Sequence, residues 1–367
     1  RKRCLLQLQE ALEREAEDLR EEIIAEVGAP WMTTVMAQVD WPLHDALRFP
    51  TDLIDSFTWE RDLGVGTAGD GRRRVTKEAV GVVAAIAPWN YPFEIISNKL
   101  GQALATGNTV VLKPDPNTPW TATRIGRIIA EHTDIPAGVV NVVPTPDNSV
   151  AELLVTDPRV DLVSFTGSTA VGKQLMRDGA DTMKRTFLEL GGKSALIVLD
   201  DANPAHIVGG AVGVCVHAGQ ACALTTRLVI HESLYPEALA SITAAYLAVP
   251  VGDPALPGTF VGPVVSAAQK QRVLDACDQA RRDGAEIVVG GGSFEDLPDY
   301  LAGGHYVQPT VIIGADSQSA IAQQEIFGPV LVVLPFRDDE EAIRIANDSV
   351  YGLAGAVLSG SIERGTA

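Results

Sequence analysis

Apolar residues at the N-terminus recur every three or four positions, the spacing that places side chains on one face of an α-helix. Many Glu and Arg residues lie between them, and Gly28 and Pro30 end the pattern. We therefore predict a surface helix over residues 1–27 with one buried face. A second helical stretch is expected over about residues 33–58, interrupted by Pro42 and Pro50. The apolar positions of the first helix are Leu5, Leu8, Leu12, Leu19 and Ile23.

From Val80 onward, short β-branched runs alternate with helical stretches. This alternation is typical of a parallel sheet covered by helices on both faces. After Gly191 it starts again, with strands expected over residues 194–199 and 225–231 and a helix over about residues 204–216. The sequence thus predicts two α/β units. The strands expected in the first unit cover residues 80–87, 109–113, 139–142, 162–165 and 186–190.

Residues 57–80 contain two polar, extended pieces, 57–63 and 73–78, around a glycine-rich stretch, which predicts a protruding β-hairpin. The stretch from Gly64 to Gly69 matches the dinucleotide fingerprint Gly-x-Gly-x-x-Gly letter for letter. That fingerprint works only where an apolar strand enters the loop and a helix leaves it. Charged residues stand on both sides here, so we interpret the stretch as a hairpin tip.

Composition and charge narrow the function. A chain of 367 residues favours about two domains. With 29 Lys and Arg against 47 Asp and Glu, the net charge of −18 would repel a phosphate backbone, so no nucleic-acid partner is expected. The apolar runs are shorter than the ~18 residues of a membrane-spanning helix. We therefore expect no membrane partner.

The four cysteines are too few for a disulfide framework, and no Cys-x-x-Cys or His-x-x-x-His pair suggests a metal site. A reducing cytoplasm is the expected location. Arg1 already lies inside the first predicted helix, so we expect that some N-terminal sequence precedes it.

Cys222 is the candidate nucleophile. It stands in the small-residue turn Gly219-Gln220-Ala221-Cys222-Ala223, where a side chain can be presented openly. The alternative is a buried structural cysteine, which is the usual role of a free thiol. Cys215, in an apolar helical stretch, and Cys277, in a charged helix, are interpreted as structural.

Two polar residues follow predicted strands of the first unit. Glu189 precedes Gly191-Gly192 at a strand's C-terminal end, where open α/β sheets place ligand-binding residues. Its alternative is a surface glutamate. Asn90 lies between Pro88 and Pro92 and is either a fixed amide donor or a turn residue.

The stretch from Gly167 to Gly172 follows a predicted strand and opens a helix that Thr166 or Ser168 can cap. Bare backbone amides at Gly167 and Ser168, with the helix dipole behind them, would suit a cofactor phosphate. Many helices begin with Gly-Ser-Thr only to be capped, so both interpretations stay open.

Together, six motifs resemble those of the aldehyde dehydrogenase superfamily, of the NAD(P)-dependent, acid-forming type. They occur in that family's order and spacing, and the likeness covers essentially the whole chain. The motifs are Pro88-Trp89-Asn90-Tyr91-Pro92, Lys113-Pro114 with Thr118-Pro119, Phe165-Thr166-Gly167-Ser168, Leu188-Glu189-Leu190-Gly191-Gly192-Lys193, Gly219-Gln220-Ala221-Cys222 and Glu325-Ile326-Phe327-Gly328-Pro329.

The resemblance implies an α/β fold with a Rossmann-like cofactor-binding domain over residues 1–56 and 81–190. A β-hairpin for oligomerisation would cover residues 57–80, and a second α/β domain, catalytic and C-terminally incomplete, residues 191–367. The complete protein would form a homodimer or homotetramer. Its substrate would be a small aldehyde, oxidised to a carboxylic acid through a cysteine thiohemiacetal and thioester.

The resemblance also implies residue roles. Cys222 would be the nucleophile and Glu189 the general base. The Asn90 side chain and the Cys222 backbone amide would form the oxyanion hole, with Lys99 near the catalytic amide. The residues implied in cofactor binding are Ile86, Trp89, Lys113, Gly167, Ser168, Leu190, Glu325 and Phe327.

Three departures from the family pattern qualify these roles. Pro116 replaces the glutamate that often binds the adenosine ribose, which leaves NADP possible, with NAD favoured. Asn98 replaces a bulky aromatic of the substrate channel, with Glu94 and Ile95 on the same helix, so the substrate need not be a simple aliphatic aldehyde. The family's C-terminal segment is missing after residues 351–354. The alternative function is therefore an inactive truncated relative that binds cofactor or forms oligomers.

Overall fold

The computed structural model describes residues 1–67, 69 and 71–367. These residues form two compact units. Unit 1 contains Arg1–Ile23 and Thr34–Glu189, and unit 2 contains Ile24–Thr33 and Leu190–Ala367. Residues 24–33, expected in the cofactor-binding domain, therefore belong to the other unit. The amide of Trp31 donates to the carbonyl oxygen of Pro254 at 2.7 Å there, and Gly28 lies against the Pro263 ring.

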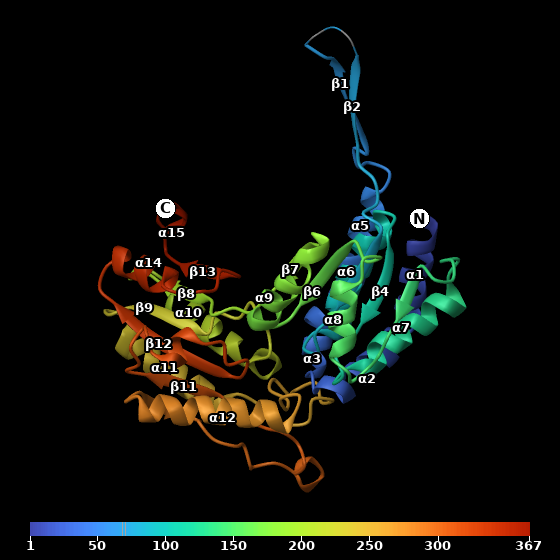
Figure 1. Cartoon of the computed structure of the whole chain (residues 1–367). Coiled ribbons are helices and arrows are strands. Elements are labelled where there is room, and N and C mark those ends of the chain that lie inside the picture. Colours follow the sequence, from blue (N-terminus) through green and yellow to red (C-terminus); the bar gives the residue numbers. More distant parts are fainter. Residues whose placement is uncertain (68, 70) are drawn as a thin grey trace. The chain divides into compact units, whose positions relative to one another are not determined.

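Unit 1 is built around a five-stranded parallel sheet with the strand order β5-β4-β3-β6-β7 (Figure 1). The prediction of a parallel sheet is confirmed, and each strand lies within two or three residues of its expected position. The chain adds strands on one side of β3 and then on the other, the topology of a doubly wound sheet. The strands are β3 (Val82–Ile86), β4 (Thr109–Lys113), β5 (Val140–Val142), β6 (Leu162–Thr166) and β7 (Arg185–Glu189).

Helices connect these strands and pack in two groups. α6 and α7 contact each other and α1, whereas α8 contacts α9. Three of the four connecting helices begin after a Ser, Thr or Asn residue, as helix starts commonly do. The connecting helices are α6 (Pro92–Ala105), α7 (Pro119–His132), α8 (Ser149–Thr156) and α9 (Thr169–Asp178).

The N-terminal region differs from its prediction. The first helix is broken at Glu15 into α1 (Lys2–Arg14) and α2 (Ala16–Val27). The expected second helix is instead a series of short α and π turns. The run is broken at Val39, whose φ is −126°, whereas Pro42 and Pro50, which were expected to interrupt it, lie inside helical turns. Because proline lacks a backbone N–H, regular α-helical bonding is not possible there, and π turns replace part of it. The series is α3 (Trp31–Thr33), η1 (Thr34–Gln38), α4 (Asp40–Pro42), η2 (Leu43–Arg48) and α5 (Phe49–Leu53).

The predicted hairpin is present in unit 1. Strands β1 (Glu60–Val65) and β2 (Arg72–Thr76) pair antiparallel (Figure 1). Every residue of both strands is exposed. Ion pairs join Arg74 to Glu60 and Arg72 to Asp62 across the strands. Gly64 lies within β1 and no helix follows the loop, so this stretch is part of a hairpin rather than a fingerprint loop. Its tip includes residues 68 and 70, which lie outside the described residues. A role in oligomerisation stays a prediction.

Unit 2 contains a six-stranded sheet with the order β10-β11-β12-β9-β8-β13. All neighbours pair in parallel except β10 and β11, which are antiparallel. The expected second α/β unit is confirmed. Its strands are β8 (Ala195–Val198), β9 (Arg227–His231), β10 (Glu286–Val289), β11 (Thr310–Ile313), β12 (Val330–Phe336) and β13 (Gly355–Leu358). Its main helices are α10 (Pro204–Val212), α11 (Tyr235–Ala248), α12 (Ala267–Arg282) and α14 (Asp339–Asn347).

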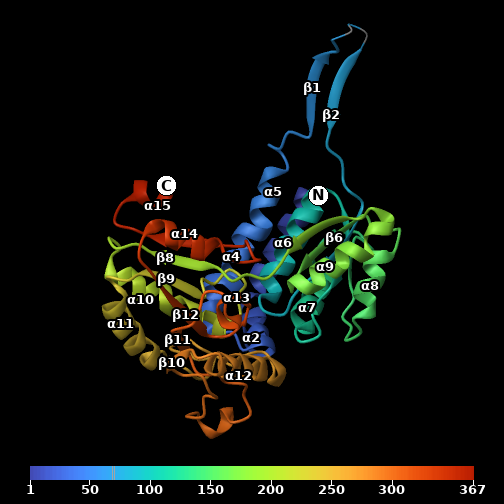
Figure 2. The same ribbon diagram turned by 60° about the vertical axis from the view of Figure 1, so that its left-hand side comes forward.

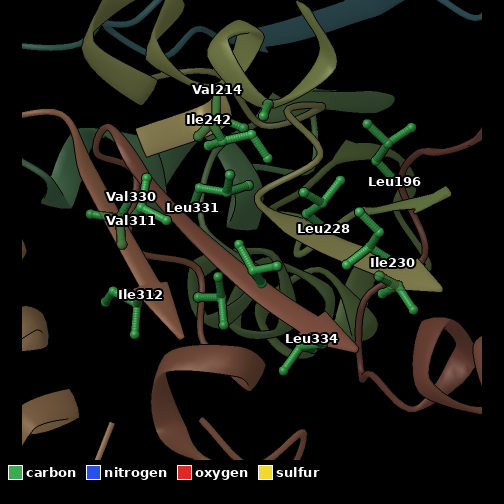
Figure 3. Packing of buried hydrophobic residues seen from close by; sticks show 14 of the residues in the cluster. Leu196, Val214, Leu228, Ile230, Ile242, Val311, Ile312, Val330, Leu331 and Leu334 are labelled. Atoms are coloured by element: carbon green, nitrogen blue, oxygen red, sulfur yellow. The ribbon is translucent and has the colours of Figure 1, made fainter. Parts of the chain in front are cut away.

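The core of unit 2 lies around its central strands (Figure 3). Side chains of β9, β11 and β12, among them Leu228, Val311 and Leu331, are fully buried, together with Ile242 from α11. A central parallel strand is covered on both faces, which explains why β12 is a nearly continuous apolar run. None of the described helices is long and apolar enough to cross a membrane.

Leu331→Ala tests the importance of this core. Removing a fully buried leucine side chain leaves a cavity, so we expect the free energy of unfolding to fall by about 2 to 5 kcal/mol. Urea denaturation followed by tryptophan fluorescence measures the change. Leu247→Ala is the matched control, because that side chain is 74% exposed and its loss should cost much less. Equal effects of the two variants would contradict this account of the core.

Candidate active site

The C-terminal ends of four neighbouring strands of unit 1 bring several predicted residues side by side. Ile86 of β3 pairs with Lys113 of β4 on one side and with Phe165 of β6 on the other, and Thr166 pairs with Glu189 of β7. The order in which strands are added reverses at β3, and open α/β sheets bind ligands outside the carboxyl ends of strands at such a point. This edge of the sheet is therefore the candidate cofactor surface.

The turn from β6 into α9 is capped as predicted. Ser168 is the N-cap, and its hydroxyl oxygen accepts a hydrogen bond from the Val171 amide at 3.3 Å. One expectation is wrong: the Gly167 amide is not bare, because it donates to the Glu189 carbonyl oxygen at 3.0 Å and extends the β6–β7 ladder. Gly167 is required here by packing, since a Cβ would lie 2.5 Å from the Phe165 ring.

The surroundings of Lys113 fit part of a dinucleotide. Its side chain is buried, and Nζ donates to the Pro114 carbonyl oxygen at 3.2 Å. Trp89, half-buried, follows β3. The buried ammonium group can donate hydrogen bonds to the hydroxyl groups of a ligand. The apolar strand end at Ile86 offers a flat apolar contact, and the N-terminus of α9 offers a favourable potential for phosphate. Among the described residues, no group of three or more His, Cys, Asp or Glu is placed to hold a metal ion.

Asn90 is buried, and its backbone accepts a hydrogen bond from a helical turn that the sequence analysis did not connect with it. Gln38, at the end of the π-helical turn η1, donates from Nε2 to the main-chain oxygen of Asn90 at 2.9 Å. Gln38 has no solvent exposure. The sequence analysis missed Gln38, because a glutamine within an amphipathic stretch resembles a surface residue. No local pattern connects it with a turn 52 residues later.

Lys99, on α6, is also buried. Its Nζ donates to the Ser164 hydroxyl of β6 at 3.0 Å. Burial lowers the pKa of Lys99 to about 8, while the negative charges of Glu189 and Glu94 oppose that shift. Glu189 is exposed at the end of β7. Ser164 was not expected in the site from the sequence.

Glu94, five positions before Lys99 on α6, has a carboxyl group with a shifted pKa. Burial raises the pKa of Glu94 to about 7, against the opposing effects of the Asn98 amide and the Lys99 ammonium. The Asn98 Nδ2 donates to Glu94 Oε1 at 2.6 Å. A carboxyl group that titrates near neutrality is a common feature of functional sites.

In unit 2, three motifs that lie far apart in the sequence come together. The Gly192 amide donates to Glu325 Oε1 at 3.1 Å, and Gly191 lies against the same carboxylate. A Cβ on Gly192 would stand 2.5 Å from the carbonyl oxygen of Cys222. Direct contacts therefore join the segment after β7 to the cysteine turn and to the segment around Glu325. These contacts require glycine at positions 191 and 192, because a side chain there would collide with the neighbouring segment.

The turn that presents Cys222 has unusual backbone geometry. It follows the 3-10 helix η4 (Gly213–Gly219), where His217, Ala218 and Gly219 have φ angles of 52°, 54° and 75°. L-residues rarely adopt such angles. Gly219 lies against the backbone of Gly328, which leaves no room for a side chain. Cys222 is half-buried and so reachable from solvent.

The other two cysteines of this unit are unlike Cys222. Cys215 and Cys277 have no solvent exposure. Burial raises the pKa of Cys215 to about 12 and that of Cys277 to about 11, so both thiols stay protonated at neutral pH. These properties suit structural residues.

The segment around Glu325 is held from α12. Gln269 Nε2 donates to the carbonyl oxygens of Ile326 and Phe327 at 3.1 and 2.8 Å, and Arg272 donates to that of Glu325 at 2.7 Å. Phe327 has a φ of 61°, a strained value that these bonds support. Burial raises the pKa of Glu325, opposed chiefly by the Gly192 amide. The sequence analysis missed Gln269 and Arg272, which lie more than fifty positions away.

A buried arginine holds the segment that follows Gly191 and Gly192. Arg227, at the start of β9, donates to the carbonyl oxygen of Lys193 at 2.8 Å and to those of Ile345 and Ala346 at 2.9 and 2.8 Å. Lys193 is itself fully buried, and burial together with the Arg227 charge lowers the pKa of Lys193 to about 7.

The predicted site residues form two sets. Unit 1 holds Ile86, Trp89, Asn90, Lys99, Lys113, Gly167, Ser168 and Glu189, and unit 2 holds Leu190, Cys222, Glu325 and Phe327.

Known proteins resemble this chain over its whole length. The sequence model described as "Aldehyde dehydrogenase family" matches residues 1–367. A 3-succinoylsemialdehyde-pyridine dehydrogenase from a Pseudomonas species is 38% identical over 366 residues, covering 98% of this chain and 73% of that protein. A peroxisomal aminoaldehyde dehydrogenase from Pisum sativum is 39% identical over 337 residues, covering 88% of this chain and 66% of its own length.

A solved structure shows the same fold. The aldehyde dehydrogenase of Mycobacterium tuberculosis, complexed with NAD+, superposes with a TM-score of 0.94 at 36% identity, covering 100% of this chain and 74% of that one. The family resemblance predicted from the six motifs is thereby confirmed. A match over the whole chain, with relatives well above 30% identity, shows that this chain belongs to the aldehyde dehydrogenase family.

Proposed function

We propose that this protein oxidises an aldehyde to a carboxylic acid with NAD(P)+, through a covalent intermediate on Cys222. The observation that carries the proposal is the presentation of Cys222, in a chain of this family. The half-buried thiol stands in a strained turn that packs against Gly192 and Gly328, whereas the neighbouring Cys215 and Cys277 are sealed in the core. Packing of this kind restricts the position of the reacting atom, which favours catalysis.

The first step is attack on the substrate. The Cys222 sulfur, as the thiolate, forms a bond to the aldehyde carbon and gives a tetrahedral thiohemiacetal with a negative oxygen. The Asn90 side-chain amide and the Cys222 backbone N–H donate hydrogen bonds to that oxygen. Loss of one such donor typically costs about 3 to 4 kcal/mol of barrier. In this scheme Gln38 restricts the backbone of Asn90, which keeps its amide in one position.

The resemblance to the family assigns cofactor contacts to residues of each set. Lys113 would bind the adenosine ribose, and Ser168, at the N-terminus of α9, the pyrophosphate. Glu325 and Phe327 would hold the nicotinamide ribose and ring, with Ile86, Trp89, Gly167 and Leu190 lining its path. NAD+, as found in the solved M. tuberculosis relative, is the cofactor that we favour over NADP+. When bound, it accepts the hydrogen and the two electrons that leave the substrate carbon.

Hydrolysis completes the reaction. Glu189 takes a proton from water, which adds to the thioester carbon on Cys222 and releases the carboxylic acid and the thiolate. Glu189 is exposed at the end of β7, so water reaches it readily. The negative charge of Glu189 acts on Lys99, where it opposes the lowering of the Lys99 pKa by burial. We also propose that the protein forms a homodimer or homotetramer through the hairpin β1–β2.

Cys222→Ala should abolish aldehyde-dependent NADH formation. Without a nucleophile no thiohemiacetal forms, and we expect kcat/KM to fall by roughly 10⁴-fold or more. NADH absorbance measured with a panel of aldehydes checks this. Cys4→Ala, a half-buried cysteine of unit 1, is the matched control and should keep wild-type activity. Retained activity of Cys222→Ala would contradict the nucleophile assignment, and a wild-type protein without activity would favour the inactive, cofactor-binding alternative.

Glu189→Gln should separate the two halves of the reaction. Acylation does not need the base, so a burst of about one NADH per active site should precede a slow steady state. Mass spectrometry should find the acyl group on Cys222. Glu237→Gln, an exposed glutamate of α11, serves as the control and should show no burst. Full steady-state turnover by Glu189→Gln, with no trapped acyl group, would exclude the base role.

A further inference from the structure

Helix α6 carries a row of polar residues along one face. Glu94, Asn98 and Gln102 follow one another at intervals of four, the spacing at which helical side chains lie above one another. Asn90, the proposed oxyanion donor, stands four positions before Glu94, just outside the helix. The row therefore starts close to the proposed reaction centre. Along this face, burial falls from the half-buried Glu94 and Asn98 to the exposed Gln102.

The Glu94 carboxylate lacks a cation of its own. Asn98 donates to it at 2.6 Å from its side-chain amide, but in the described part of the chain Glu94 takes part in no ion pair. Lys99 acts on it only at a distance, because its ammonium group is bonded to Ser164. Burial disfavours the charged carboxylate, so a positive ligand placed beside it would gain more than it would in water.

Beyond Asn98 the row borders a cavity of about 340 Å³ within unit 1. Asn98 and Gln102 line one side of the cavity, and α5 and the segment before it line the other with apolar surface, including Phe49 and Leu53. Asp45 supplies the charge in the lining, and that charge is negative. An apolar wall with negative charge nearby suits a cation that carries methyl or methylene groups.

We propose that Glu94, held by Asn98, selects aldehydes that carry a positive charge several carbons from the carbonyl group. The inference rests on the proposed function, since it places the carbonyl at Asn90. Asn90 directly precedes Tyr91, the N-cap of α6, and the Ile95 amide donates to the Tyr91 carbonyl oxygen at 3.0 Å, so Glu94 lies about one helical turn, roughly 6 Å, beyond Asn90. An ammonium group at that distance from the carbonyl reaches Glu94, and its substituents extend towards the cavity. A short neutral aldehyde gains nothing from the carboxylate.

Two aldehydes of the same shape test this selection. 4-(Trimethylammonio)butanal carries the charge, and 5,5-dimethylhexanal replaces its nitrogen with carbon. We expect wild-type kcat/KM to favour the cationic aldehyde by about tenfold or more, the ratio that 1.4 kcal/mol of interaction provides. Glu94→Gln should reduce that preference by about tenfold, because glutamine keeps the shape and loses the charge. Glu94→Asp should restore part of the preference.

Glu152→Gln is the control. Glu152 is an exposed glutamate on α8 of the same unit, and its replacement should leave the preference at the wild-type value. Equal wild-type kcat/KM for the two aldehydes would overturn the selection while leaving the proposed function intact, and this comparison needs no variant. A preference unchanged in Glu94→Gln would overturn the role of Glu94. Wild-type protein that oxidises neither these two aldehydes nor any other would reject both proposals.

Discussion

The close approach of backbone segments at Gly192 and Gly219 is the constraint on which the nucleophile of this protein depends. Gly192 lies against the carbonyl oxygen of Cys222, and Gly219 lies against Gly328. Three loop segments of unit 2 can meet there only because no side chain stands between them. The backbone angles of His217 and Ala218 store strain, and the surrounding contacts maintain it. Gln269, Arg272 and Arg227 hold the same loop segments through hydrogen bonds to carbonyl oxygens, of which the Arg227 bond is buried and the Arg272 bond exposed.

A second constraint acts in unit 1, where the register of the parallel sheet determines which side chains stand together. Ile86 pairs with Lys113 and Phe165, and Thr166 pairs with Glu189, so the ends of these strands lie side by side. Figure 2 shows β6 and the helix α9 that follows it. Burial then changes the chemistry of the groups on α6, lowering the pKa of Lys99 and raising that of Glu94. A helix with ionisable groups in its protected face costs stability, which is understandable where those groups contact a substrate.

The sequence was sufficient for the parts of the fold that local pattern determines. The expected strand over residues 109–113 coincides with β4, because β-branched residues between turn-forming ones leave few alternatives. The region after residue 33 was predicted less well, since the helical turns continue through Pro42 and Pro50 and the break lies at Val39, which no sequence signal marked. Gln38 and Gln269 could not be found, because their partners lie more than fifty residues away. The Gly167 amide was assigned to a ligand because its bond to Glu189 depends on tertiary register. The roles of the site residues themselves remain proposals.

The most direct test of the central constraint is Gly192→Ala. A Cβ at this position would stand 2.5 Å from the Cys222 carbonyl oxygen, so the turn must shift to accept it. The measurement is the rate at which iodoacetamide alkylates Cys222, followed by mass spectrometry, together with kcat/KM for aldehyde oxidation. Gly209→Ala is the matched control, because the space around Gly209 on α10 is open. We predict that Gly192→Ala lowers kcat/KM by about 10²-fold, as small displacements of a reacting atom do, and changes the alkylation rate, while Gly209→Ala matches wild type in both. Wild-type alkylation and oxidation in Gly192→Ala would show that the close approach does not position Cys222.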